Sequence, residues 1–201
     1  MKKLLFLLAV LLYTINSNAQ TAVEYFDKGN TKFKLKDFTG AIADYKKSIE
    51  LEPNKSGAYL NTAIANDNLK DYTSAIINYT RVIEIDSTVT QAYYNKGTAN
   101  FNLKKFSNAI ANYTKAIAIN PNHAEAYSMR GISKLQLQDT IGALSDFDQA
   151  IKIDPDFSEA YYNRGLLKLQ LEQKDSACLD FTKASDLGQI QAVLLKGKFC
   201  H

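Results

Sequence analysis

The chain has 201 residues, of which 46% are hydrophobic and 22% are charged, with 24 Lys and Arg against 21 Asp and Glu. Without Lys2 and Lys3, which lie in a leader that we expect to be removed, the balance is 22 against 21, a net charge of +1. This near-neutral balance, without a long basic run, argues against nucleic acid as a partner, because a face that follows phosphates needs clustered Lys and Arg.

Residues 1–19 have the composition of a cleavable signal peptide. Lys2 and Lys3 precede an apolar run, and Ser17 and Ala19 supply the small residues of a cleavage site after Ala19. The apolar run is shorter than the roughly 20 residues that a membrane-spanning helix needs. The alternative is an uncleaved anchor helix. A cleaved leader predicts an exported protein, periplasmic or secreted, with no stable insertion in the membrane.

The rest of the chain repeats with a period of 34 residues. Three columns of small residues and prolines keep this spacing: Ala41, Ala75, Ala109, Ala143 and Ala177; Gly29, Gly97, Gly131 and Gly165, with Ala63 in the remaining unit; and Pro53, Pro121 and Pro155. Such regularity is the signature of stacked supersecondary units. We therefore predict five units, at residues 22–55, 56–89, 90–123, 124–157 and 158–191.

Each unit is predicted to hold two helices, at about its second to fourteenth and eighteenth to thirtieth positions. Apolar residues such as Ile42, Tyr45 and Ile49 recur there at spacings of three and four, which is typical of a helix with one buried face. A proline such as Pro155 ends the second helix, because it disfavours helical geometry in the residue before it. The small columns predict close helix contacts, with Tyr or Phe filling the neighbouring space.

The segment 189–200 is predicted to form a C-terminal capping helix. A stacked array leaves its last apolar face open unless another element covers it. We expect Ile190, Val193, Leu194 and Phe199 to pack on the second helix of the fifth unit.

The chain has two cysteines, Cys178 on the second helix of the fifth unit and Cys200 at the end of the predicted cap. In an exported protein a pair of cysteines more often forms a disulfide than remains as two thiols. We therefore predict a Cys178–Cys200 disulfide, with two buried free thiols as the alternative.

The sequence offers little for catalysis. His123 and His201 do not stand at metal-ligand spacing from another His or Cys, and we expect His123 to be a solvated turn residue. We find no phosphate loop or nucleophile motif, and we expect carboxylates such as Asp146, Asp148 and Glu159 to lie on solvated faces. The prediction is a protein that is not an enzyme, with no metal and no cofactor.

Taken together, these columns resemble the tetratricopeptide repeat, whose pattern has an early aromatic residue, a small residue and Tyr in the first helix, Ala and Phe in the second, and a final Pro. Tyr replaces the usual Trp, and the second unit lacks the Gly and the Pro. In the fifth unit, Asp175 and Gln189 depart from the family pattern. The resemblance implies an all-α fold, a right-handed α-solenoid of five helix-turn-helix units plus the capping helix.

The resemblance also implies a non-catalytic protein–protein interaction module, or scaffold, that binds a peptide or protein partner in a concave groove lined by the first helices. The groove residues that it implies are Phe26, Asn30, Phe33, Asn61, Asn68, Tyr94, Asn95, Phe101, Asn102, Tyr162 and Asn163. Asparagine can pair with a peptide backbone, and aromatic rings add rigid apolar contact area. The alternative is that these residues only solvate and brace the inner face.

Some members of the family grip a C-terminal carboxylate with Lys and Arg in the groove, but this chain has Phe26, Gln91 and Asn95 at such positions. A second candidate function is a structural subunit that assembles with itself or with an envelope complex through its convex face or its ends. A carrier of a small ligand comes third.

Overall fold

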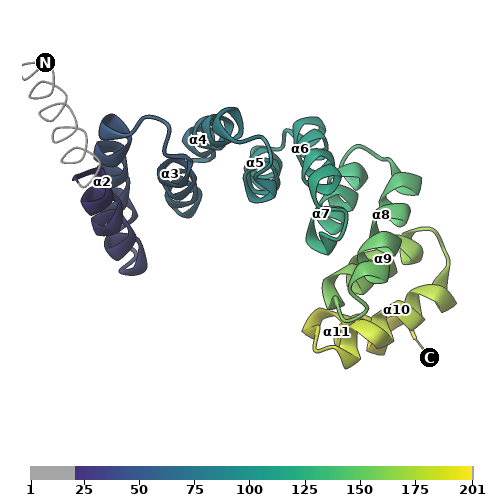
Figure 1. Ribbon diagram of the computed structural model, residues 1–201. Coiled ribbons are helices and arrows are strands. Elements are labelled where there is room, and N and C mark those ends of the chain that lie inside the picture. The colour runs from purple at the N-terminus through teal and green to yellow at the C-terminus, as the bar shows by residue number, and fades with distance from the viewer. Residues whose placement is uncertain (1–20, 201) are drawn as a thin grey trace, which may run out of the picture. The chain divides into compact units, whose positions relative to one another are not determined.

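The computed structural model describes residues 21–200, in which every regular element is a helix (Figure 1). Residues 21–34 are helical and are followed by α2 (Phe38–Leu51), α3 (Ser56–Asn68), α4 (Tyr72–Ile85), α5 (Thr90–Asn102), α6 (Phe106–Ile119), α7 (Ala124–Leu135), α8 (Thr140–Ile153), α9 (Ser158–Gln170), α10 (Lys174–Asp186) and α11 (Ile190–Phe199). The predicted all-α solenoid class is confirmed. The predicted signal peptide lies outside the described residues.

The chain forms two compact units, the first ending at Ala99 and the second beginning at Asn100. In the first unit α3 packs against both α2 and α4, and in the second each helix from α6 to α11 packs against the next one along the chain. Across residues 21–200, no helix combines the length and the apolar character that a membrane span requires.

The second helices of the repeats begin one residue earlier than predicted, and in three of the five a side-chain cap stabilises that start, whereas α6 and α10 begin there without one. Asp37, Asp71 and Asp139 each stand just before a helix and accept a hydrogen bond from the backbone N–H three residues on, over 2.9, 3.1 and 2.9 Å. Such caps satisfy a backbone donor that has no partner within the helix. They fix the start of α2, α4 and α8.

The turn between the two helices of each repeat contains a residue in the left-handed conformation. Its φ lies between 58° and 64° in all five repeats, at Lys36, Lys70, Lys104, Gln138 and Glu172. At Lys36 the backbone N–H donates to the Phe33 carbonyl, and the next N–H, of Asp37, donates to the Lys32 carbonyl. This pair of hydrogen bonds is the Schellman motif that closes many helices, although glycine usually occupies the left-handed position. Its recurrence gives every helix pair the same turn.

The glycine column lies against the aromatic residues near the middle of the second helices. A Cβ atom placed at Gly131 would lie 3.0 Å from Cε1 of Phe147, and one placed at Gly165 would lie 2.8 Å from Cε1 of Phe181. Both rings are fully buried, as are those of Tyr113 and Tyr79. The predicted alternation of small and large residues is therefore the packing rule within a helix pair.

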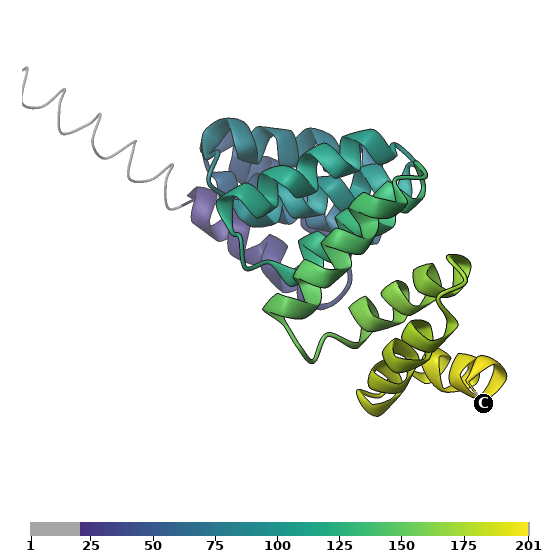
Figure 2. The ribbon, with the colours of Figure 1, turned by 90° about the vertical axis from the view of Figure 1, so that its right-hand side faces the viewer.

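The C-terminal helix α11 packs on α10, as Figure 2 shows at the yellow end of the chain, but not through the residues that we predicted. Ala192 is its buried contact, whereas Ile190 and Leu194 are 74% and 71% exposed and Val193 is also exposed. The prediction that these three residues cover the array was wrong, because a small residue allows the closest approach of α11 to α10. The Cα atoms of Cys178 and Cys200 lie 5.5 Å apart, with their sulfur atoms at bonding distance.

Candidate functional site

The amides of Asn30 and Asn61, two predicted groove residues, meet at a buried tyrosine. Oδ1 of Asn30 accepts a hydrogen bond from the Tyr45 hydroxyl over 3.0 Å and another from Nδ2 of Asn61 over 2.9 Å. The Tyr45 ring is 1% exposed, so its hydroxyl needs a partner within the protein. Burial raises the pKa of Tyr45, while the hydrogen bond with Asn61 acts in the opposite direction. These two asparagines therefore connect the first two repeats.

Asn95 plays a similar part at Tyr79, the matching tyrosine of the second repeat. The Tyr79 hydroxyl donates to Oδ2 of Asp67 over 2.5 Å and also has a hydrogen bond with Asn95. Burial, and then the bond to Asp67, raise the pKa of Tyr79 above its ordinary value. Burial also raises the pKa of Asp67, although the bond from Tyr79 opposes that change. Thus Asn95 too belongs to the internal framework.

Four of the predicted groove aromatics pack edge-on or tilted against rings of the second helices. The ring centroids are 5.7 Å apart for Phe26 and Tyr45, 5.3 Å for Phe33 and Phe38, 5.5 Å for Phe101 and Phe106, and 6.4 Å for Tyr162 and Phe181. Phe26, Phe33, Phe101 and Tyr162 are only half-buried. One side of each ring braces the helix pair and the rest remains accessible.

The remaining predicted groove residues differ in exposure. Asn68 is exposed, and its Nδ2 donates to the Ile64 carbonyl of its own helix over 2.8 Å. Asn102 is exposed, and Asn163 and Tyr94 are half-buried. Asn68 and Asn102 occupy the same position of their repeats and are the most accessible members of the set.

The structure brings Asn30 and Asn61 into direct contact, but it does not gather the eleven residues into one constellation. Those from Phe26 to Asn95 belong to the first unit, and Phe101, Asn102, Tyr162 and Asn163 belong to the second. Within each unit they are distributed along the first helices of the repeats, as expected for an extended surface rather than a compact site.

Sequence reasoning missed two buried ion networks in the second unit. The guanidinium of Arg130 donates to both carboxylate oxygens of Asp146, over 2.9 and 2.6 Å, and Nζ of Lys134 lies 2.8 Å from the same carboxylate. The prediction that Asp146 is solvated was wrong, since the residue is 2% exposed. Its two cationic partners make this burial tolerable.

The fifth repeat has the same network one period later, in Arg164, Lys168 and Asp180. Nη1 of Arg164 also lies 2.6 Å from Asp148, which is exposed and belongs to the preceding repeat. The pKa of Arg164 is raised despite its burial, because Asp180 and Asp148 stabilise the charged form. The signal for these networks in the sequence was an Arg and a Lys followed by an Asp at the same separations in the fourth and fifth repeats.

No group of three or more His, Cys, Asp or Glu residues suited to a metal ion is found within residues 21–200. His123 is half-buried, with Nδ1 3.0 Å from Oε2 of Glu125. His201 lies outside the described residues.

Together, the uniform turn, the glycine–aromatic contacts and the links between repeats define a protein built from stacked helix pairs. Sequence profiles described as "Tetratricopeptide repeat" match residues 22–55, 56–88, 90–123 and 158–187, and one described as "TPR repeat" matches 133–171. A search of curated proteins found no match.

Solved structures give the same result. The structure described as "Crystal structure of MamA protein" is 30% identical, covering 86% of this chain and 94% of that one, with a TM-score of 0.78. YrrB, described as a TPR protein with an unusual peptide-binding site, is 23% identical, covering 93% and 96%, with a TM-score of 0.75. The first TPR domain of Spaghetti (RPAP3) is 28% identical, covering 60% and 95%, with a TM-score of 0.58. The chain belongs to the tetratricopeptide repeat family.

Proposed function

We propose that the protein is a non-catalytic interaction scaffold that holds an extended segment of a protein partner along the first helices of its repeats. Membership of the tetratricopeptide repeat family supports protein binding in general. The first TPR domain of Spaghetti (RPAP3) was solved bound to an HSP90 peptide, SRMEEVD, which shows a peptide on a related helix array.

The observation that carries this proposal is the contrast between two sets of aromatic residues. Tyr45, Tyr79, Tyr113, Phe147 and Phe181, on the second helices, are at most 1% exposed. The groove aromatics Phe26, Phe33, Phe101 and Tyr162 are only half-buried. Rigid rings left partly accessible beside polar amides are the usual composition of a surface that binds protein segments.

The chemistry of this surface favours recognition that does not depend on charge. Asn68 and Asn102 are exposed amides that can both donate to and accept from a peptide backbone. The positions at which some family members carry a basic carboxylate clamp hold Phe26, Gln91 and Asn95. We therefore infer an internal, extended segment of the partner as the ligand rather than a C-terminal carboxylate.

We also propose that the protein acts after export, in the periplasm or outside the cell. The composition of residues 1–19 supports this proposal, because it has the charged, apolar and small-residue regions of a signal peptide in the expected order. The neighbouring cysteines Cys178 and Cys200 support it as well, since disulfides persist in oxidising compartments.

Site-specific photocrosslinking in the native envelope tests the proposal. A photoreactive phenylalanine analogue replaces Asn68 on α3 or Asn102 on α5, and in the control it replaces Asn112 on α6. Asn112 is a matched control, because its Nδ2 also donates to a carbonyl four residues earlier in its own helix, over 2.7 Å. We expect the same partner to be captured from residues 68 and 102 and not from 112. Capture from 112 alone would contradict groove binding.

A second candidate function, assembly through the end of the array, is favoured by the exposed side chains of Ile190, Val193 and Leu194 on α11. Exposed apolar residues on one helix mark surfaces that associate with other proteins. The same crosslinker at Leu194 distinguishes the two functions: crosslinks between copies of the chain, without capture from 68 or 102, would favour assembly over peptide binding.

A further inference from the structure

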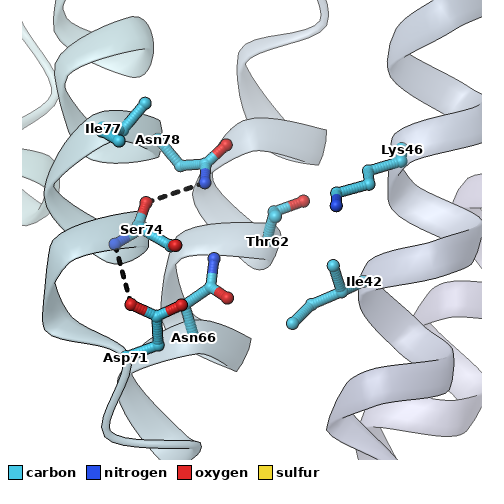
Figure 3. Close-up of a pocket in the computed structure, with 8 residues that line it drawn as sticks. All are labelled: Ile42, Lys46, Thr62, Asn66, Asp71, Ser74, Ile77 and Asn78. Atoms are coloured by element: carbon cyan, nitrogen blue, oxygen red, sulfur yellow. Dashed lines mark hydrogen bonds between the residues drawn. The ribbon is translucent and has the colours of Figure 1, made fainter.

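A polar hollow of 230 Å³ lies between α2, α3 and α4 of the first unit (Figure 3). Its lining comes from Ile42 and Lys46 on α2, Thr62 and Asn66 on α3, and Asp71, Ser74, Ile77 and Asn78 at the start of α4. None of these residues belongs to the predicted groove set. The hollow is therefore a feature separate from the proposed peptide-binding surface.

The hollow lies where the fourth and fifth repeats hold their buried ion networks. The residues at matching positions of the 34-residue repeat differ. Thr62 of the second repeat corresponds to Arg130 and Arg164. Asn66 corresponds to Lys134 and Lys168, and Asn78 corresponds to Asp146 and Asp180. In the preceding repeat, Lys46 takes the place that Asp148 has beside Arg164. Because Thr and Asn are shorter than Arg and Lys, the space that the long side chains fill in the later repeats stays open in the second.

The side chain of Asn66 contributes hydrogen-bonding groups that face the hollow. Asn66 is 7% exposed, and its amide has no hydrogen-bond partner among residues 21–200, although it points into the hollow (Figure 3). Among the described residues, the buried side-chain atoms without a partner are Oδ2 of Asp44 and Oδ1 of Asp67, so the polar atoms of Asn66 reach the open hollow, where water or a ligand can bind them. The Thr62 hydroxyl already donates to the Ala58 carbonyl over 2.7 Å, and Nδ2 of Asn78 donates to the Ser74 carbonyl over 2.9 Å. Thr62 and Asn78 therefore offer oxygen lone pairs, and Asn66 offers both N–H groups and an oxygen.

Opposite charges lie on two sides of the hollow, with Lys46 across from Asp71 (Figure 3). Both Lys46 and Asp71 are exposed at the rim of the hollow. Oδ1 of Asp71 accepts from the Ser74 backbone N–H over 3.1 Å, and a carboxylate has further lone pairs to offer. The lining is thus neutral as a whole but positive on the α2 side and negative at the start of α4.

We propose that the hollow binds a small zwitterion, an α-amino acid. Its carboxylate would accept from Lys46 and from the N–H groups of Asn66, and its ammonium would donate to Asp71 and to Oδ1 of Asn78. Ile42 and Ile77 supply an apolar wall for a short side chain. The volume equals that of roughly eight waters at about 30 Å³ each and is below the range of about 300–1,000 Å³ of sites for larger ligands. It therefore suits a ligand of a few heavy atoms.

Calorimetric titration of the mature protein with L-alanine, L-serine and L-glutamine tests the proposal. N-acetyl-L-alanine lacks the ammonium and L-alaninamide lacks the carboxylate, so each removes one of the two charge contacts. We expect at least one free amino acid to bind in the millimolar range or tighter, and each blocked analogue of alanine to bind at least about tenfold more weakly than alanine or not at all. No binding by any free amino acid, or equal binding by the blocked forms, would overturn the proposal.

Two kinds of variant then assign the binding to the hollow. The combined change Lys46→Asp, Thr62→Arg, Asn66→Lys and Asn78→Asp introduces the complete set of the fifth repeat, fills the hollow and should abolish binding. Lys46→Gln removes only the cation and should weaken binding about tenfold, whereas Lys47→Gln, on the same helix but outside the lining, should not. If the combined variant fails to fold, the comparison of Lys46→Gln with Lys47→Gln decides. Equal affinity in these two single variants would place the ligand elsewhere and contradict the proposal.

Discussion

Two tyrosine hydroxyls of the first unit, on Tyr45 and Tyr79, lie inside the helix stack, and each needs a hydrogen-bond partner there. Asn30 and Asn61 serve the first, and Asp67 and Asn95 serve the second. A residue that faces the groove can thus be part of the framework, and its substitution would change stability as well as binding. For this reason the exposed Asn68 and Asn102 are better probes of the groove than Asn95.

Replacing Asp67 with Asn should stabilise the protein at neutral pH. Burial raises the pKa of Asp67, so the folded state binds the proton more tightly than the unfolded state does. This group's contribution to stability is therefore largest below its ordinary pKa of 3.8 and is lost as the pH rises through the higher folded value. Asn keeps an oxygen acceptor for the Tyr79 hydroxyl and carries no charge. Urea unfolding at pH 4 and pH 7 should show that the advantage of the variant over the wild type grows with pH.

Asp71→Asn is the control for this experiment, because we expect it to change the stability at neutral pH in the opposite direction. Hydrogen bonds from Ser74 lower the pKa of Asp71, so its ionised form stabilises the fold above the ordinary pKa, and this contribution is lost as the pH falls through the lower folded value. The variant should lose stability at neutral pH relative to the wild type. If the effect of Asp67→Asn does not change with pH, the carboxylate of Asp67 is not penalised by burial.

Residue partnerships were the part of the site that the sequence could not reveal. Asn30 and Asn61 are recognisable as groove positions, but their shared contact with Tyr45 depends on the exact approach of two helices. Asp146 was interpreted as solvated because a single carboxylate in a helix usually is. Its burial follows from Arg130 and Lys134, which reach it from the neighbouring helix.

Within the helix pairs, the contact of a glycine on the first helix with a ring on the second sets how closely the two approach. Glycine in a helix costs roughly 1 kcal/mol relative to alanine, so its recurrence needs a compensating gain. The burial of Phe147 against Gly131 and of Phe181 against Gly165 provides that gain.

Gly131→Leu should therefore destabilise the protein by about 1–3 kcal/mol, because the added side chain would overlap Phe147 and the backbone of α8. A Cβ atom there already lies 3.3 Å from the Ala143 carbonyl oxygen and 3.0 Å from the Phe147 ring. Gly197→Leu is the matched control, since a Cβ atom on this helical glycine meets nothing within 4 Å. Chemical denaturation of both variants provides the measurement. Equal midpoints for the two would show that the glycine column is not a packing requirement.

For the helices and helix pairs, the sequence predicted most of what is observed. The period and the apolar spacing predicted the helix pairs, and the helices of the described residues begin and end within one or two positions of expectation. The left-handed turn was not predicted, because Lys36, Lys70 and Lys104 stand where glycine is the usual signal. The hydrogen bonds of the turn and the packing of the two helices it joins hold these residues in that conformation.

For the molecule as a whole, the ends of the array are less predictable than its middle, since an end has a neighbour on one side only. Helix α11 follows the last repeat and packs on α10, but it leaves Ile190, Val193 and Leu194 exposed. Helix α11 is short, at ten residues, and such a helix is marginal alone in water. Its attachment to α10 therefore needs additional support.

The cysteine pair can supply this support by linking Cys178 on α10 to Cys200 directly after α11. The two residues are 22 positions apart in the sequence, and closing a loop of that size stabilises a folded chain by about 3 kcal/mol on the chain-entropy account. Replacing both cysteines with serine should lower stability by about that amount, and hydrogen exchange should rise mainly in α11, because helix pairs further from the bridge have their own packing. Mass spectrometry of the folded wild-type protein under non-reducing conditions should find a mass two hydrogens below that of the reduced chain and no thiol open to alkylation. If both thiols are alkylated in the folded protein, the bond is absent and the attachment of α11 depends on the contact of Ala192 with α10.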